Sequence, residues 1–303
     1  MQIRNVLARE LINEFLGTMI LILIGDSIVA VIIAGGQGHN AHVIGPIGWG
    51  TAIFCAVFVA GGVSAHINPA VTLALASAKE FPLKKVPLFW LAQYLGAFVG
   101  AVLVYVMYRD VINHFDGGVR SVVGEKGTAA IFSTYPREEV TTLTCFFDQV
   151  ISTAVLMLTV AAIVDERNFA VPKALLPLML GMLIVAEIFA FSHNCMAALN
   201  PARDIGPRIF TAISGWGSQV FTFRNYQWVW VPIFGPHIGA IIGLWIYKLC
   251  IRDHWPVQEM TSLKQVVSAA SNGDNPGKTV ESIVLRPAGE NRTEGDQTNT
   301  GKI

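Results

Sequence analysis

The chain has 303 residues, of which 53% are hydrophobic and only 14% are charged, and its formal net charge is zero. A soluble domain carries about 25% charged residues, so this composition and a mean hydropathy of +0.52 indicate a protein of the lipid bilayer. Zero net charge gives no argument for a nucleic-acid partner. The cysteines lie in apolar runs without metal-ligand spacing, which favours buried thiols, and no cofactor is expected.

After an N-terminal segment, residues 1–10, three apolar runs are long enough to cross a bilayer, which takes about 20 residues. We predict spans over residues 11–34, 45–62 and 87–108. The first run is too long for the core of a signal peptide, and no small-residue cleavage site accompanies it. The helical part of residues 64–75 covers only half a bilayer.

The stretch 109–140 is polar and rich in glycine, so we predict a long connection there rather than a span. Further spans are predicted over residues 142–164, 174–191 and 229–251. A second short segment, 200–213, precedes the last of them. The second half of the chain therefore repeats the order of elements found in the first half.

These elements define a membrane domain over residues 11–252, followed by a polar tail, 253–303. The tail is rich in Gly, Asn and Thr, which predicts disorder. Within the membrane domain, two repeats of about residues 11–110 and 140–252 flank the connection 110–140.

The repeats also share glycine positions: Gly96 and Gly100 in the third span align with Gly239 and Gly243 in the sixth. Small residues at this spacing let membrane helices approach closely. Each repeat has three spans and one half-helix. Because three crossings end on the opposite side of the membrane, the second repeat is inverted relative to the first. Inverted repeats with broken helices occur in transporters and serve a channel equally well. The predicted fold is therefore an all-α membrane protein with six transmembrane helices and two re-entrant half-helices.

Each short segment begins with an Asn-Pro-Ala box. Proline suits the first position of a helix, and asparagine directly before it is a preferred N-cap, so each box predicts a helix start. One box alone is weak evidence, since Asn-Pro more often marks a turn, but two boxes in a chain with internal repeats are a strong signal. The box residues are Asn68, Pro69, Ala70, Asn200, Pro201 and Ala202.

Over about residues 11–251 the chain resembles the major intrinsic protein family, and within it the aquaglyceroporin branch. The resemblance is carried by the Glu-Phe-Leu-Gly-Thr run at 14–18, by both boxes, and by the second box running on to Asp204 and to Gly206-Pro207-Arg208. Asp204 favours the glycerol branch. The resemblance implies six tilted helices around two half-helices that meet head to head, and a homotetramer with one pore per subunit.

The physics of such a site follows from the residues themselves. Two half-helices that meet at their N-termini aim the positive ends of their dipoles at one point. There the side-chain amides of Asn68 and Asn200 can donate to a passing oxygen atom. We expect residues 64–67 and 193–199 to be extended backbone, which is tolerated at this depth only where carbonyls face a water-filled path. Such a path suits a neutral hydroxyl-bearing solute and repels cations and protons.

An arginine inside the membrane is costly and by default functional, so we expect Arg203 to lie in the pore. The alternative is that Arg203 only neutralises Asp204. The resemblance places Trp49 at the aromatic filter position, although a membrane tryptophan is more often an interfacial anchor.

The resemblance also implies supporting residues for the two carbonyl-bearing loops. Glu14 and Asp148 are expected at equivalent positions of the two repeats, where they would brace these loops by hydrogen bonds. A proton relay is the alternative role for these carboxylates. His66 is expected to be a packing group whose backbone carbonyl matters more than its ring, and Asp204 to hold the loop near Arg203.

The sequence departs from the family pattern at four pore or span positions. Ala197 stands where many glycerol channels have an aromatic ring, and Ile188 stands where a His or a small residue is usual. Ala197 widens the filter and Ile188 takes some of that room back. Asp26 and Glu187 place carboxylates in the first and fifth spans, where apolar or small residues are usual.

Glu187 directly precedes Ile188 and is expected to face either the pore flank or a neighbouring helix. Its possible partners are Arg203 across the pore mouth, or a hydroxyl or carbonyl that satisfies a neutral carboxyl group. The first alternative yields the hypothesis that glycerol permeability depends on pH between about 5 and 7.5 and that Glu187→Gln abolishes the dependence.

The leading functional prediction is a passive channel for glycerol, other small neutral solutes and water that excludes protons and ions. The alternatives are a mainly water-selective channel and a proton-coupled secondary transporter. The sequence offers no nucleophile–base pair or metal cluster that would support an enzyme. Basic residues in the N-terminal segment and in the loops after Ala78 and Asp165 favour cytoplasmic termini, and we expect the plasma membrane as the location.

Overall fold

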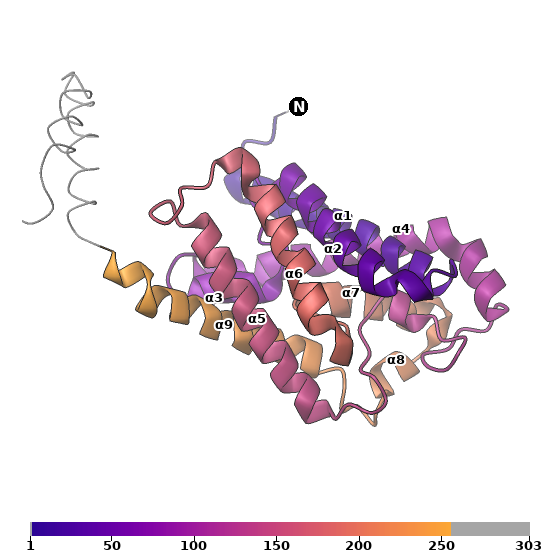
Figure 1. Cartoon of the computed structure of the whole chain (residues 1–303). Coiled ribbons are helices and arrows are strands. Elements are labelled where there is room, and N and C mark those ends of the chain that lie inside the picture. The colour runs from indigo at the N-terminus through magenta and orange to yellow at the C-terminus, as the bar shows by residue number, and fades with distance from the viewer. Residues whose placement is uncertain (1, 256–303) are drawn as a thin grey trace, which may run out of the picture. The chain divides into compact units, whose positions relative to one another are not determined.

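The computed structural model describes residues 2–255, which form helices and connections and contain no strand (Figure 1). Six of the described helices are long and apolar enough to cross a membrane. Large apolar side chains such as Phe58 and Val106 remain exposed on these helices, at 65% and 69%, which suits contact with lipid. The predicted all-α architecture with six spans is therefore confirmed.

The helices follow one another in two similar sets. The first set consists of α1 (Val6–Ile33), α2 (Ala41–Ala60), the short α3 (Pro69–Ser77) and α4 (Val86–Asp116). The second set consists of α5 (Thr142–Val164), α6 (Leu176–Cys195), the short α7 (Pro201–Thr211) and α9 (Val231–Cys250), with the single turn α8 (Gln219–Thr222) before α9.

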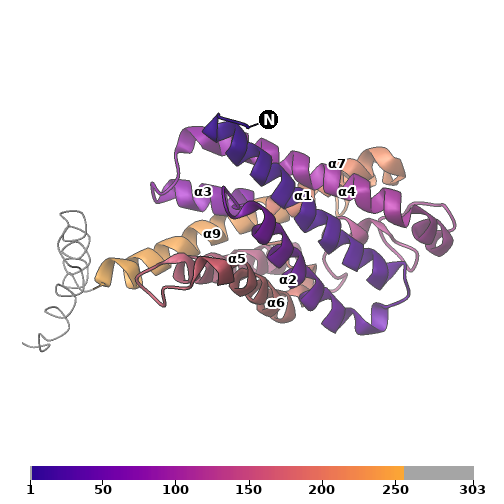
Figure 2. The same ribbon diagram turned by 90° about the horizontal axis from the view of Figure 1, so that it is seen from above.

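The two sets pair their helices in the same way. Helix α1 packs along α4 and α5 packs along α9, as both views show (Figures 1 and 2). A side chain at Gly96 would collide with the backbone carbonyl of Phe15, and one at Gly239 would collide with that of Val150. The glycines predicted to allow close approach therefore do so at both helix pairs. Helices α2 and α6 pack against each other between the two pairs.

The third span is longer than predicted. Helix α4 continues through the polar stretch 109–116 and ends only at Gly117, whose φ of 70° is the left-handed conformation that glycine adopts readily. The prediction that the connection begins at residue 109 is thus wrong. Hydropathy marks where apolar contact with lipid ends, and a helix can extend beyond that point into polar surroundings.

The rest of the connection is not a solvated linker. Ile131, Phe132, Ser133 and Thr134 are fully buried, after a short 3-10 turn over Ala129–Ile131. This part of the connection folds back against the second half-helix and brings backbone groups to the site described below.

The chain divides into two units, Met1–Ile251 and Arg252–Ile303. The first unit contains the elements α1 to α9. In the second unit the structure describes a 3-10 turn over Arg252–His254. Most of the tail predicted over residues 253–303, from residue 256 on, lies outside the described residues.

Candidate functional site

The two short helices meet at their N-termini, and each box caps its own helix. Asn68 Oδ1 accepts a hydrogen bond from the Ala70 amide at 2.9 Å, and Asn200 Oδ1 accepts one from the Ala202 amide at 2.9 Å. Proline follows each asparagine at the first helical position. Both boxes therefore start helices as predicted.

Each asparagine also donates to the loop of the other box. Asn68 Nδ2 donates to the Leu199 carbonyl at 3.0 Å, and Asn200 Nδ2 donates to the Ile67 carbonyl at 2.7 Å. These crosswise bonds join residues from opposite halves of the chain and hold the N-termini of α3 and α7 against one another.

The loop before the first box is held by one buried carboxylate. Glu14 accepts hydrogen bonds from the backbone amides of His66 and Ile67, at 2.8 and 2.7 Å. It also accepts from the hydroxyl of Ser64 and from the side-chain amide of Gln93. Glu14 is fully buried, and its partners lie on the loop and on α4.

The corresponding position in the second half is Gln149, not Asp148. The glycine packing equates Phe15 with Val150, which places Gln149 opposite Glu14. Gln149 Oε1 accepts from the Leu199 amide at 3.1 Å, whereas Asp148 accepts from Asn194 at 2.7 Å, near the end of α6. The predicted equivalence of Glu14 and Asp148 is therefore wrong by one residue.

The backbone before each box adopts conformations that are unfavourable for residues with a side chain. Ile67 has a φ of 44°, and before the second box Ala197 and Leu199 have φ values of 43° and 55°. Such conformations persist only where the surroundings enforce them, and they cluster at functional sites. At Ile67 and Leu199, the bonds to Glu14, Gln149 and the crosswise amides enforce them.

A cavity of about 110 Å³ lies where the half-helices meet. Apolar side chains from α1, α2, α5 and α6 form most of its wall, and the two loops with both box asparagines, Val71 of α3 and Arg203 of α7 form the remainder. The predicted pore residues that line this one cavity are Trp49, Asn68, Ile188, Ala197, Asn200 and Arg203.

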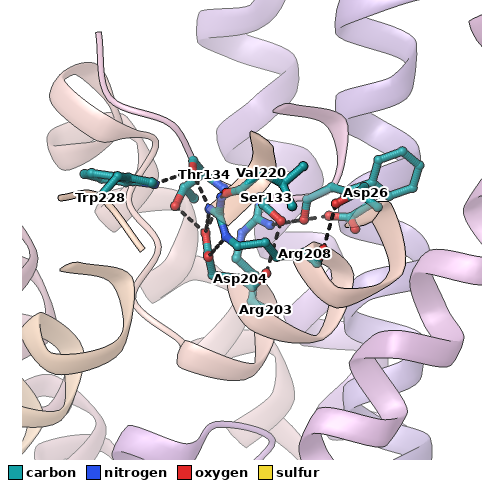
Figure 3. A network of polar contacts seen from close by, with 10 residues as sticks. Asp26, Ser133, Thr134, Arg203, Asp204, Arg208, Val220 and Trp228 are labelled. Atoms are coloured by element: carbon teal, nitrogen blue, oxygen red, sulfur yellow. Dashed lines mark hydrogen bonds and ion pairs between the residues drawn. The ribbon is translucent and has the colours of Figure 1, made fainter. Parts of the chain in front are cut away.

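Arg203 is 4% exposed, and its guanidinium is surrounded on three sides. Its Nη1 donates to the Phe132 carbonyl at 2.9 Å, and its Cζ lies 4.4 Å from the centre of the Trp49 ring. Nη1 also lies 3.6 Å from Oδ1 of Asp26 (Figure 3). Cation–π contact and an ion pair thus stabilise a charge that would otherwise be costly in the membrane.

Asp204 does not pair with Arg203. Its oxygens accept from Arg208 Nε at 2.8 Å and from the Thr134 amide at 2.8 Å, and all three residues are fully buried (Figure 3). Arg208 donates further to the carbonyls of Thr134 and Val220. The alternative in which Arg203 merely neutralises Asp204 is therefore wrong, because Asp204 has Arg208 as its counter-ion.

Glu187 is 2% exposed, and its Oε2 accepts no hydrogen bond from any residue between 2 and 255. Within the same range Arg203 has an ion pair with Asp26 and none with Glu187. Glu187 and Arg203 are thus not the partners that one hypothesis required.

His66 lines the cavity, its ring packs on Phe81 and Phe89, and its Nδ1 lies 3.2 Å from the Thr72 hydroxyl.

Sequence reasoning assigned no role to several residues that hold the site. Arg208 stands four residues after Asp204 on the same helix, a spacing that pairs opposite charges and was a usable signal. The sequence held no signal for Gln149, because the glycines equate it with Glu14 only through their packing against α1 and α5. Phe132 and Thr134 had none, because they act through backbone groups brought in by tertiary packing.

The chain was compared with known families and structures. The model of the family described as "Major intrinsic protein" matches residues 2–247. Aquaporin-9 of Homo sapiens is 40% identical over 284 residues, covering 93% of this chain and 94% of that protein. Aquaporin-10 of Homo sapiens is 40% identical over 257 residues, covering 84% and 85%. The aquaglyceroporin of Plasmodium falciparum has a similar structure, with a TM-score of 0.70 and 31% identity over 80% of this chain and 95% of that one.

Six membrane-spanning helices around two half-helices, with a cavity at their junction, define a multi-pass membrane channel rather than an enzyme. The chain belongs to the major intrinsic protein family.

Proposed function

We propose that this channel conducts glycerol and other small neutral solutes, and water with them, by passive diffusion. The observation that carries the proposal is the two-sided wall of the cavity. Trp49 and Ile188 form an apolar side, while Arg203 and the two box asparagines supply hydrogen-bond donors. A polyol has a carbon side and a hydroxyl side, so it matches both walls at once.

The box asparagines are the donors at the centre of the path. An amide nitrogen carries two N–H groups, and each asparagine gives one of them to a loop carbonyl of the other half. The second N–H of each amide remains for a solute hydroxyl or a water molecule. Asn68 and Asn200 retain 6% and 7% exposure, which they present to the cavity.

The same geometry supports exclusion of ions and protons. The N-termini of α3 and α7 carry partial positive charge and point at the junction, which disfavours a cation there. A water molecule that accepts from both asparagines has its oxygen fixed toward them, which interrupts a chain of proton transfers. We propose that this central barrier acts on every solute that passes.

The assembly and orientation belong to the proposal as well. We propose a homotetramer with one pore in each subunit, located in the plasma membrane with cytoplasmic termini and a cytoplasmic tail. The support for the orientation is the basic character of the N-terminal segment and of the loops after Ala78 and Asp165.

Stopped-flow light scattering on proteoliposomes, with empty liposomes as the control, tests the proposal. We expect glycerol and water permeabilities that both exceed those of the control and do not saturate with glycerol concentration. Water permeation without glycerol permeation would indicate the water-selective alternative. Saturable uptake that follows an imposed proton gradient would indicate a secondary transporter.

A further inference from the structure

Asp26 is a buried carboxylate within the first membrane-spanning helix. It lies on α1, is fully buried, and neither of its oxygens accepts a hydrogen bond from a residue between 2 and 255. Its ion pair within the described residues is with the guanidinium of Arg203, 3.6 Å away. Burying a carboxylate without hydrogen bonds inside a membrane-spanning segment costs free energy, which an interaction of this group has to offset.

The neighbouring glycine shows that this part of α1 is fitted to the filter. A side chain at Gly25 would collide with the indole of Trp49, so α1 leaves room for the ring at that position. The same ring carries the guanidinium of Arg203 on its face. Gly25 and Asp26 thus serve two groups of one site, Trp49 and Arg203.

The contacts of Arg203 leave part of its guanidinium for the cavity. Within the described residues, its hydrogen bond to Phe132 and its ion pair with Asp26 both involve Nη1. Nε and Nη2 carry three further N–H groups. Because Nη1 is held by α1 and by the connection, the remaining donors are fixed in direction toward a solute.

Among residues 2–255, the guanidinium of Arg203 forms its ion pair with Asp26. The neighbouring carboxylate, Asp204, is bound to Arg208, so that pair carries no net charge. Asp26 is therefore the group that offsets the charge of Arg203. Without it, a buried guanidinium with unused donors would face the cavity, and such a group binds small planar anions through paired N–H bonds.

We propose that Asp26 is a specificity-determining residue: it keeps the filter electrically neutral, so that Arg203 donates to uncharged solutes without holding small anions. The proposal rests on the proposed function, in which Arg203 faces the permeating solute. It adds that neutrality of the filter comes from an ion pair on the side away from the path.

Nitrate is a suitable probe, because it is small, planar and anionic at every accessible pH. Glycerol permeability of proteoliposomes is measured in increasing nitrate, with gluconate, a bulkier and non-planar anion, as the osmotically matched salt. For Asp26→Asn we expect nitrate to halve glycerol permeability at a concentration at least about tenfold below the highest one that leaves the wild type uninhibited, which corresponds to at least about 1.4 kcal/mol of anion binding. An unchanged nitrate sensitivity overturns the proposal.

Asp116→Asn is the matched control. Asp116 also forms a buried pair with an arginine, Arg120, at 2.6 Å, but it lies at the end of α4 and outside the cavity. This variant should keep the nitrate sensitivity of the wild type. A fall of equal size in the control would also overturn the proposal, because the effect would then not come from the filter.

A second pair of variants separates charge from shape. In an Arg203→Ala background, Asp26→Asn should produce no gain in nitrate sensitivity, since the group that binds nitrate is gone. A gain there contradicts the proposal. Should Asp26→Asn fail to insert, the wild type still decides: the proposal requires glycerol permeability in nitrate to match that in gluconate, and inhibition by nitrate overturns it.

Failure of the proposed function gives a different result. If the wild type conducts water but no glycerol, the solute assignment is wrong, and the same nitrate series is then read on water permeability. The sensitivity of Asp26→Asn relative to the wild type still decides the role of Asp26.

Discussion

Where they meet, α3 and α7 make the same contacts: each is capped by its asparagine, and each asparagine donates to the opposite loop. Beyond that point they differ. Helix α3 contains no charged residue, and a single carboxylate, Glu14, braces the loop before it. Helix α7 contains three charged residues, all buried, and its loop is braced by the neutral Gln149.

This difference separates two properties of the pore. At the centre both halves contribute the same groups, so the barrier there can be the same for every solute. The outer part of α7 has the charges, and it faces Trp49 and the connection, so it can distinguish one solute from another. Under the proposed function, symmetry accounts for the central barrier, and its loss in the second half accounts for the selection of solutes.

The largest effect should come from breaking the charged network of α7. Arg208→Met leaves Asp204 buried without its counter-ion, which costs about 3–5 kcal/mol. We expect a loss of folded protein, measured by size-exclusion chromatography and by thermal unfolding in detergent. Adding Asp204→Asn should restore part of the stability. An Arg208→Met protein that unfolds at the wild-type temperature contradicts this account.

The bracing of the two loops should differ in strength. Glu14→Gln turns one carboxylate oxygen into a donor that faces other donors, which we expect to cost about 2–3 kcal/mol. Gln149→Ala leaves one backbone amide without its acceptor and should cost about 1 kcal/mol. Thermal unfolding of both variants is the measurement. Equal costs would mean that the charge of Glu14 adds nothing.

The centre should respond alike in both halves. Asn68→Asp or Asn200→Asp places a carboxylate at the helix N-termini and offsets their positive ends, so cation conductance should rise at least about tenfold. Conductance in planar bilayers, normalised to inserted protein, is the measurement. Wild-type conductance in both variants would count against the central barrier, and a rise in only one would count against its symmetry.

Selection between glycerol and water should depend on the size of the side chain at position 197. Ala197→Phe fills part of the cavity beside Arg203 and should lower glycerol permeability about tenfold and water permeability less than about threefold. Ala190→Phe, on an exposed position of α6, is the control and should change neither. Equal losses of water and glycerol permeability would place Ala197 outside the filter.

The smallest effect concerns the second unusual carboxylate. Asp26 has Arg203 as its counter-ion, whereas Glu187 is buried next to the cavity-lining Ile188 without a described ion pair. Because Glu187 lacks the Arg203 partner that the pH hypothesis required, we expect glycerol permeability between pH 5 and 7.5 to be flat for the wild type and for Glu187→Gln alike. A wild-type slope that Glu187→Gln removes contradicts this expectation.

Local signals predicted the frame of the molecule. Apolar runs predicted the six spans, and the Asn-Pro pairs predicted both helix starts, because hydropathy and capping depend on neighbouring residues. The end of α4 escaped prediction since its last turns are polar, and only the conformation of Gly117 ends the helix.

The partners of the site residues depended on tertiary structure. Nothing near Arg203 in the sequence indicates that Asp26 and the Phe132 carbonyl would lie beside it. The brace of the second loop was misplaced by one residue, because Asp148 has the charge that matched Glu14 while Gln149 has the position. Charge pointed to Asp148 and position along the helix pointed to Gln149. The packing of the glycines against α1 and α5 decides for Gln149.

The crosswise bonds have a consequence for the synthesis of the chain. Asn68 is made 131 positions before Leu199, so at ribosomal speed its partner emerges roughly 7 to 26 s later. Glu14, by contrast, precedes His66 by 52 positions and is already present when the first loop forms. The charged brace, Glu14, therefore lies in the half that is synthesised first and that lacks its crosswise partner until the second half emerges. The neutral brace, Gln149, lies in the half that is synthesised last, when the groups of the first half are already present.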